Sequence, residues 1–163
     1  MSLTKIIRGA FVSRQKEIER YDKEAEALQM EVLHYLMSNA KHTEYGRKYS
    51  FGAVGSYSDY ASHVPVNTYE ELKGYIDRMR HGERDLLWKG SVKWYAKSSG
   101  TTNDKSKFIP VSHDGLQHVH YAGGKDAVAL YLRNNPDSRL FDGKSLILGG
   151  SHSPNYGVAD SLV

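Results

Sequence analysis

Two short stretches rich in β-branched and aromatic residues constrain this sequence more than any other feature, because they flank a long polar segment. Residues 91–96 read SVKWYA and residues 107–111 read KFIPV, and both patterns are typical of β-strands. Pro110 cannot donate a ladder hydrogen bond, which predicts that the second strand lies at a sheet edge or that the proline lies at a strand end. The sequence therefore predicts two strands joined by the loop from Lys97 to Lys107.

Helical periodicity precedes these strands. Apolar residues recur at three- or four-residue steps between residues 14 and 40, which predicts a helix. The residues expected on its buried face are Ile18, Tyr21, Ala25, Leu28, Val32 and Leu36. Residues 47–66 show no sustained period and are predicted to be loop with one short helical turn. Thr68 and Glu71 have capping-box spacing, which predicts a second helix ending near residues 81–82.

A third helix is predicted from His113 to about Arg133, with Ser112 as its cap. Its expected core-facing residues are Leu116, Val119, Gly123, Ala127, Leu130 and Tyr131. Residues 145–149, SLILG, predict a further buried strand. The order of elements predicts an α/β fold, in which N-terminal helices are followed by the start of a mixed sheet with flanking helices.

Charge and composition exclude several classes of partner. The 22 Lys and Arg residues against 19 Asp and Glu residues leave a dispersed net charge of +3, whereas nucleic acid usually requires a concentrated basic face. Cysteine is absent, which excludes disulfides and thiolate metal sites. No segment has the apolar length of a membrane span, and the first residues lack a signal-peptide core. The sequence predicts a cytoplasmic protein with no nucleic-acid and no membrane partner.

The loop between the predicted strands has the composition that polyphosphate binding requires. Gly100 allows the backbone to turn sharply and present its N–H groups, and the neighbouring hydroxyls are short donors. A lysine at the end of the loop can offset charge on a departing pyrophosphate. The loop is not a Walker P-loop, because Gly143-Lys144-Ser145 has Ser138 where the first glycine would be needed.

The run YAKSSGTTNDKSKFIPV, from Tyr95 to Val111, is similar to the nucleotide-binding motif of the auxin-responsive acyl-acid amido synthetase family, which belongs to the acyl-adenylate-forming superfamily. Further segments resemble the family in the same order, and the resemblance spans about residues 41 to 155. One departure is Asp104, where related loops usually carry a second glycine. The additional matching segments are TEYGRKYSF, VPV with YEEL, GE with LW, and FDGKSL with GGS.

The resemblance implies a two-step reaction. A small-molecule carboxylic acid would attack the α-phosphate of ATP to give an acyl-adenylate and pyrophosphate. The amine of an amino acid would then displace AMP and form an amide. By matching position, Lys107 would be the catalytic residue and Mg²⁺ would bridge the phosphates. The residues that would bind the β- and γ-phosphates are Ser98, Ser99, Gly100, Thr101 and Thr102.

The family's acid-binding helix corresponds to residues 113–133, so the resemblance places the acid near Tyr121, Gly124 and Lys125. No protein-held metal ion is predicted, because His118 and His120 would point about 200° apart on a helix and no HExxH pattern is present.

Family members are longer than this sequence, so residues 1–163 are expected to form part of the N-terminal ATP- and acyl-acid-binding domain. The downstream sheet strands and the C-terminal lid domain are expected to be absent, and this chain alone is expected to be inactive. Two alternatives are a standalone nucleotide-binding module without catalysis and a degenerate module without a ligand.

Overall fold

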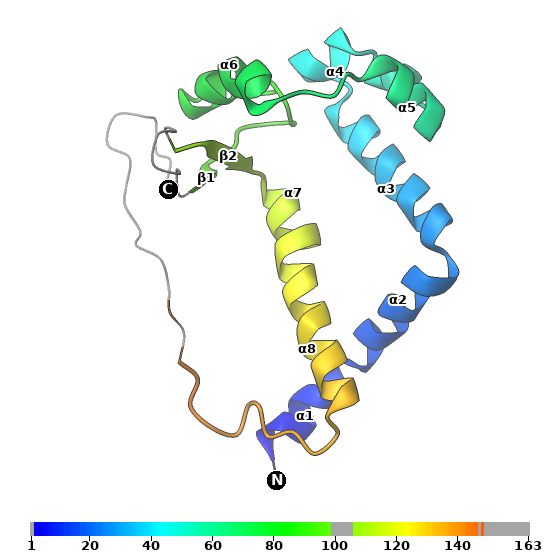
Figure 1. The fold of residues 1–163 in the computed structure, drawn as a ribbon, viewed down its shortest axis with the longest axis vertical. Helices are drawn as coiled ribbons and strands as arrows, with labels where there is room; N and C mark the ends of the chain where they lie inside the picture. Colours follow the sequence, from blue (N-terminus) through cyan, green and yellow to red (C-terminus); the bar gives the residue numbers. More distant parts are fainter. Residues whose placement is uncertain (1, 99–105, 147, 149–163) are drawn as a thin grey trace. The chain divides into compact units, whose positions relative to one another are not determined.

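The computed structural model describes residues 2–98, 106–146 and 148 (Figure 1). These residues fall into two compact units. Unit 1 consists of the described residues of 1–28 and 114–151, and unit 2 consists of those of 29–113. No helix in the described ranges is long and apolar enough to cross a membrane.

The helix predicted over residues 14–40 is divided into α2 (Val12–Lys23) and α3 (Ala25–Ala40). The division falls at Glu24, whose φ of −128° and ψ of 25° leave the helical region. The predicted end of the helix, before residue 41, is confirmed. A further helix that was not predicted, α1 (Leu3–Ala10), precedes them.

The expected buried face of α3 is wrong. Val32 and Leu36 are 56% and 40% exposed, whereas Met37 and Ala40 are buried in the first apolar cluster of unit 2 and Leu33 packs against it. The residues 33, 37 and 40 also follow helical spacing, so periodicity alone does not decide between the two faces. The remaining buried members of this cluster are Tyr45, Phe51 and Val54.

Residues 47–66 are mainly helical, so the loop predicted there is wrong. The segment contains the end of α4 (Glu44–Lys48), a 3₁₀ turn (Phe51–Ala53) and α5 (Tyr57–His63). Two side-chain caps begin these short helices: the Thr43 hydroxyl accepts from Gly46 N at 2.9 Å, and the Ser56 hydroxyl accepts from Asp59 N at 3.1 Å. Caps of this kind stabilise helices that are too short to be stable in isolation.

Gly46 lies very close to the end of α3. A Cβ built on Gly46 would lie 2.0 Å from the carbonyl oxygen of Ala40. The start of α4 is also held by backbone bonds, from Glu44 N to Asp85 O at 2.8 Å and from Tyr45 N to Leu86 O at 3.0 Å. Glycine is therefore required at position 46 for α3 and α4 to pack as they do.

The helix α6 (Tyr69–Arg80) has the predicted capping box. The Thr68 backbone N–H donates to the Glu71 carboxylate at 2.6 Å, and Glu71 N donates to the Thr68 hydroxyl at 3.4 Å. The helix is followed by His81 and then by Gly82, whose φ is 89°, so its predicted end is confirmed.

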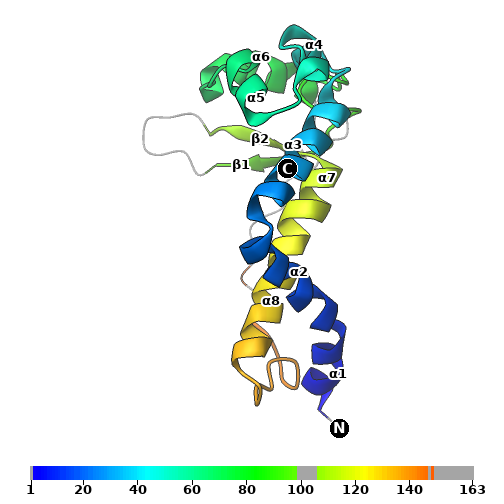
Figure 2. The same ribbon diagram turned by 90° about the vertical axis from the view of Figure 1, so that its right-hand side faces the viewer.

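The two predicted strands form an antiparallel hairpin of β1 (Trp94–Lys97) and β2 (Phe108–Val111), which lie side by side in Figure 2. Tyr95 pairs with Pro110, and both strands of this two-stranded sheet are edges, as the proline predicts. A second apolar cluster, formed by Ile76, Met79, Leu86, Val92 and Tyr95, holds the hairpin and α6 together.

In unit 1, α2 packs against α8 (Ala122–Asn134), as Figure 1 shows. The helical run begins with α7 (His113–Gly115) and a π-helical turn (Leu116–Tyr121), so its predicted extent is confirmed. The expected face is wrong: Val119 is 72% exposed, and Ala129 and Leu132 are the buried residues of α8. A π turn adds a residue to the helical period and rotates the faces on either side of it.

Polar contacts join the start of α1 to the segment after α8. The Asp142 carboxylate accepts from the Ser2 hydroxyl at 2.7 Å and from Thr4 N at 2.9 Å, and the Thr4 hydroxyl accepts from Phe141 N at 3.0 Å. The strand predicted over residues 145–149 is wrong in its described part. Residues 145, 146 and 148 form no strand, and Leu146 and Leu148 are 89% and 92% exposed.

The described chain is thus mostly helical with a small sheet. N-terminal helices come first and the sheet begins after them, as the sequence predicts, although the described sheet consists of two antiparallel strands.

Candidate functional site

The ends of the predicted phosphate-binding loop meet at the open end of the β1–β2 hairpin. Ser98 N donates to Lys107 O at 2.9 Å, and Lys107 N donates to the Ser98 hydroxyl oxygen at 3.0 Å. A hydroxyl can accept and donate at once, so accepting this bond does not consume the Ser98 proton. The structure therefore brings together two of the predicted site residues, which we call the loop stem.

The other predicted loop residues lie outside the described residues. Their phosphate-binding role stays a prediction, and so does the effect of Asp104. These residues are Ser99, Gly100, Thr101 and Thr102.

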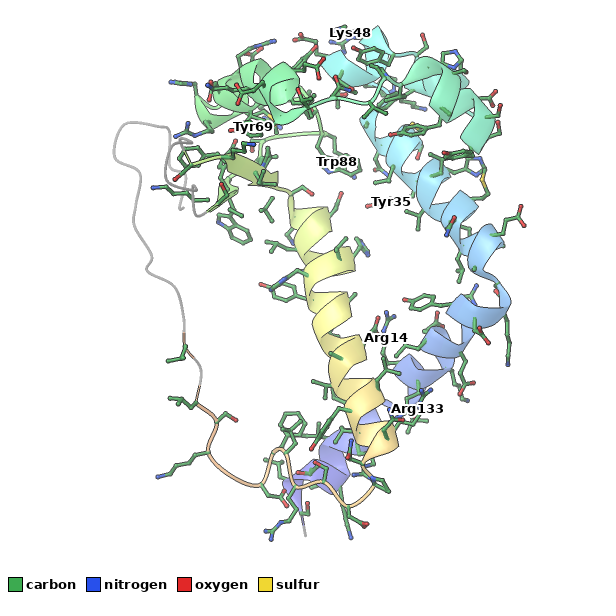
Figure 3. All side chains as sticks on the ribbon, viewed as in Figure 1. Arg14, Tyr35, Lys48, Tyr69, Trp88 and Arg133 are labelled. Atoms are coloured by element: carbon green, nitrogen blue, oxygen red, sulfur yellow. The ribbon has the colours of Figure 1, made fainter. Side chains whose placement is uncertain are left out.

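Tyr69, the first residue of α6, contacts Lys107 of the stem and the next residue, Phe108. Its hydroxyl accepts a hydrogen bond from Phe108 N at 3.1 Å, and its ring centroid lies 5.4 Å from the Lys107 ammonium nitrogen. Figure 3 shows Tyr69 beside the hairpin at the start of α6. The capping-box spacing predicts a helix start at Tyr69, but no pattern in the sequence connects Tyr69 with the loop.

Arg80, at the other end of α6, contacts the same strand. Its guanidinium carbon lies 3.7 Å from the ring centroid of Phe108, and its side chain forms an ion pair with Asp77 at 3.6 Å. Residues 69 and 80 are about three helical turns apart and so lie on one face of the helix. The spacing of residues 69 and 80 in the sequence thus indicates that both side chains can contact the same neighbouring element.

Tyr95, in β1, is only 4% exposed, and its hydroxyl donates to Val92 O at 3.3 Å. Burial raises the pKa of the Tyr95 hydroxyl, and the nearby Arg80 charge partly opposes that rise. Tyr95 is therefore neutral at physiological pH, and β1 is anchored by packing and one hydrogen bond.

The predicted acid-binding residues lie in unit 1, at the junction of the π-helical turn and α8. Tyr121 is 47% exposed, with the His120 ring 5.4 Å away in an edge-to-face arrangement. Lys125 is exposed, and a Cβ on Gly124 would meet no atom within 4 Å. This surface has open space for a ligand, but Ser98 and Lys107 belong to unit 2, so the acid-binding role stays a prediction.

Two open grooves lie elsewhere in the described residues. The groove in unit 1 is about 680 Å³ and polar, lined by Ser2, Lys5, Asp137, Arg139 and Asp142 among others. The groove in unit 2 is about 550 Å³ and mainly apolar, with Met37, Tyr60, Leu72 and Trp88 in its lining. Neither groove contains a predicted site residue. Across the described ranges, no cluster of three or more His, Asp or Glu side chains could hold a metal ion.

Comparison with known proteins gives consistent matches. Residues 14–156 match the model of the GH3 family N-terminal domain. An indole-3-acetic acid-amido synthetase of Arabidopsis thaliana, GH3.15, is 34% identical over 121 residues, which cover 74% of this chain and 20% of that protein. A jasmonoyl–L-amino acid synthetase of Nicotiana attenuata, JAR4, is 27% identical over 103 residues, which cover 63% of this chain and 18% of that protein.

Solved structures match as well. The GH3.15 acyl acid amido synthetase superposes with a TM-score of 0.74 at 28% identity, covering 90% of this chain and 26% of that one. The AtGH3.15 enzyme in complex with 2,4-DB superposes with a TM-score of 0.63 at 27% identity, covering 77% and 21%. The chain thus spans about a fifth to a quarter of the length of the relatives it matches, and its fold is that of their N-terminal region.

Proposed function

The chain belongs to the GH3 family, and from this membership we propose that it supplies the ATP-phosphate loop and part of the acid-binding surface of an acyl acid amido synthetase. The family match carries the proposal, because it runs through the predicted loop, both strands of its stem and the predicted acid-binding helix. An ATP-dependent reaction also fits the predicted cytoplasmic location.

At the loop stem, the described side chains have the chemistry that a phosphate requires. Ser98 offers a hydroxyl proton, and Lys107 offers an ammonium group, on adjacent backbone positions of the paired strands. We propose that they bind phosphate oxygens of ATP together with the predicted donors of the loop. When bound, ATP would supply the adenylyl group that activates the acid, with pyrophosphate as the leaving group, and Mg²⁺ would offset the charge of its phosphates. Lys107 offsets the negative charge that accumulates on the leaving pyrophosphate.

For the acid, we propose the exposed surface formed by Tyr121, Gly124 and Lys125. Gly124 leaves open space on this surface, and Tyr121 offers an exposed ring that suits a flat apolar group, while Lys125 is an exposed helix residue there. The amide is then formed with an amino acid. The particular acid and amino acid are not proposed, since the relatives named above act on different acids.

The whole reaction is not assigned to these 163 residues. The 121 matched residues correspond to 20% of the length of GH3.15, so we propose that the isolated chain binds nucleotide without completing catalysis. The intact mass of the natural gene product should be compared with the 18.4 kDa of this chain before activity is assayed.

Carboxylate-dependent exchange between ATP and pyrophosphate, measured on the natural gene product, tests the function. We expect exchange in the wild type and a loss of about a hundredfold or more in Lys107→Ala. Lys93→Ala is the matched control, because Lys93 is an exposed lysine of the same unit outside the loop. Equal losses in both variants would refute the assigned role of Lys107.

The two alternatives predict different results when nucleotide binding and the melting temperature of the same protein are measured beside exchange. Nucleotide binding that Lys107→Ala abolishes, without any exchange, would favour a nucleotide-binding module. A melting temperature that Mg·ATP leaves unchanged would favour a degenerate module, because any ligand of the folded state raises the melting temperature.

A further inference from the structure

Lys107 needs to keep its full positive charge near the phosphates, yet its long side chain also needs a fixed position. A carboxylate partner would fix it but would repel the phosphates and cancel its charge. An aromatic ring attracts an ammonium group through its quadrupole without neutralising it. The Tyr69 ring lies 5.4 Å from the Lys107 ammonium nitrogen, within the range of this interaction.

We propose that Tyr69 is a positioning residue for the phosphate site: its ring holds the Lys107 ammonium beside the loop stem, and its hydroxyl fixes the strand backbone at Phe108. This inference rests on the proposed function, because it assigns Lys107 to the phosphates. The two contacts act on the consecutive residues Lys107 and Phe108, at 5.4 Å and 3.1 Å. Tyr69 thereby restrains both the Lys107 side chain and the backbone of the next residue, Phe108.

The helix that carries Tyr69 is held at both ends. The capping box of Thr68 and Glu71 fixes its first turn, directly beside Tyr69. At the other end, Arg80 lies over the Phe108 ring at 3.7 Å. Between them, Ile76 and Met79 are buried with Tyr95 of β1 in the second apolar cluster. The position of Tyr69 relative to β2 is thus determined by packing on one rigid helix rather than by a loop.

The first measurement is independent of any activity. In an NMR spectrum of the isotopically labelled chain, the Lys107 Hε protons should show an upfield ring-current shift, because the ammonium group beside them lies over the Tyr69 ring. Tyr69→Phe should retain this shift and Tyr69→Leu should remove it. An unshifted Lys107 signal in the wild type would overturn the inference.

The second measurement is the affinity for Mg·ATP by titration calorimetry. Tyr69→Leu should weaken binding about threefold to tenfold, which corresponds to the loss of one cation–π contact. Tyr69→Phe keeps the ring but removes the hydroxyl that accepts from Phe108 N, so it should weaken binding less than Tyr69→Leu does. In a Lys107→Met background the same Tyr69→Leu change should cost no more than Tyr69→Phe costs in the wild type, since the ring acts through Lys107 and only the hydroxyl acts on the Phe108 backbone.

Tyr49→Leu is the matched control, because the ring centroid of Tyr49 lies 5.0 Å from the Lys48 ammonium nitrogen and neither residue belongs to the stem. It should leave Mg·ATP affinity unchanged. Additive effects of Tyr69→Leu and Lys107→Met would overturn the positioning role alone. A wild type that shows the ring-current shift but binds no Mg·ATP would overturn the proposed function and the inference with it.

Discussion

The two units are stabilised by different kinds of contact. Of the buried apolar side chains in the described residues, all but Ala129 and Leu132 belong to unit 2. Unit 1 has the Asp142 hydrogen bonds to Ser2 and Thr4 at one end and the Arg14–Asp126 pair between α2 and α8. Figure 3 labels Arg14 on α2. Apolar burial depends little on pH or salt, whereas charged contacts depend on both.

The sequence provides a way to observe the two units separately. Both tryptophans, Trp88 and Trp94, lie in unit 2. Tryptophan fluorescence therefore reports on unit 2, and far-UV circular dichroism reports the helices of both units. A change in circular dichroism without a change in tryptophan fluorescence therefore reports on unit 1.

The largest effect is expected from Gly46→Ala in unit 2. Its Cβ would lie 2.0 Å from the Ala40 carbonyl oxygen, a backbone atom, so α3 and α4 would have to separate. We expect a loss of about 3 kcal/mol in unfolding free energy, measured by tryptophan fluorescence in urea.

Gly74→Ala is the control for this change. Gly74 lies inside α6, and a Cβ there would meet no atom within 4 Å. It should stabilise unit 2 by up to about 1 kcal/mol through helix propensity. Equal unfolding midpoints for the two variants would contradict the packing assigned to Gly46.

An intermediate effect is expected from Thr4→Val in unit 1. Thr4 is fully buried, and its hydroxyl donates to Asp142 at 3.0 Å while accepting from Phe141 N. Valine has a similar shape but removes the acceptor of Phe141 N and one of the donors to Asp142, so we expect a loss of about 2 kcal/mol. The loss should appear in circular dichroism before tryptophan fluorescence. A simultaneous change in both signals would contradict the separation of the units.

Acid should affect unit 1 first. Hydrogen bonds from Thr4 N and the Ser2 hydroxyl hold the pKa of Asp142 well below its usual value. Because the folded-state pKa is depressed, this stabilisation is present above the unfolded pKa of about 3.9 and is lost as pH falls through the folded pKa. Hydrogen bonds from Arg78 also lower the pKa values of Glu44 and Glu83 in unit 2, but that unit retains its apolar clusters. Circular dichroism between pH 6 and 2 should therefore change before fluorescence. The reverse order would contradict this comparison.

The smallest effect is expected at the ion pair of unit 1. Arg14 and Asp126 are 25% and 21% exposed, so water and salt partly screen their attraction. Asp126→Asn should cost about 1 kcal/mol at low salt and less in 1 M NaCl, measured by the thermal change in circular dichroism. Glu24→Gln removes the more exposed pair with Arg20 and should cost less than Asp126→Asn. A larger cost for Glu24→Gln would reverse the ranking.

Local signals were predicted well from the sequence. The capping box of Thr68 and Glu71, the ends of α3 and α6, and both strands depend on residues close together in the chain. The buried faces of α3 and α8 were not predicted, because several apolar stripes fit one helical period and distant partners select among them. Residues 145–149 have the composition of a buried strand, but no partner strand pairs with their described part.

The site was predictable to the same extent. The resemblance located Ser98 and Lys107, which the fold brings together through hairpin pairing. The contact from Tyr69 to Phe108 joins residues 39 positions apart, and no local pattern encodes it. Helix spacing placed residues 69 and 80 on one face of α6 but could not identify the strand that this face meets.

The capping box at the start of α6 has a consequence for heat tolerance. Helices fray from their ends, and Tyr69 occupies the first turn, where opening costs the least free energy. If Tyr69 positions Lys107, warming should loosen the nucleotide site before the surrounding unit melts. The upper working temperature of the site would then depend on Thr68 and Glu71, two exposed residues, rather than on the apolar interior.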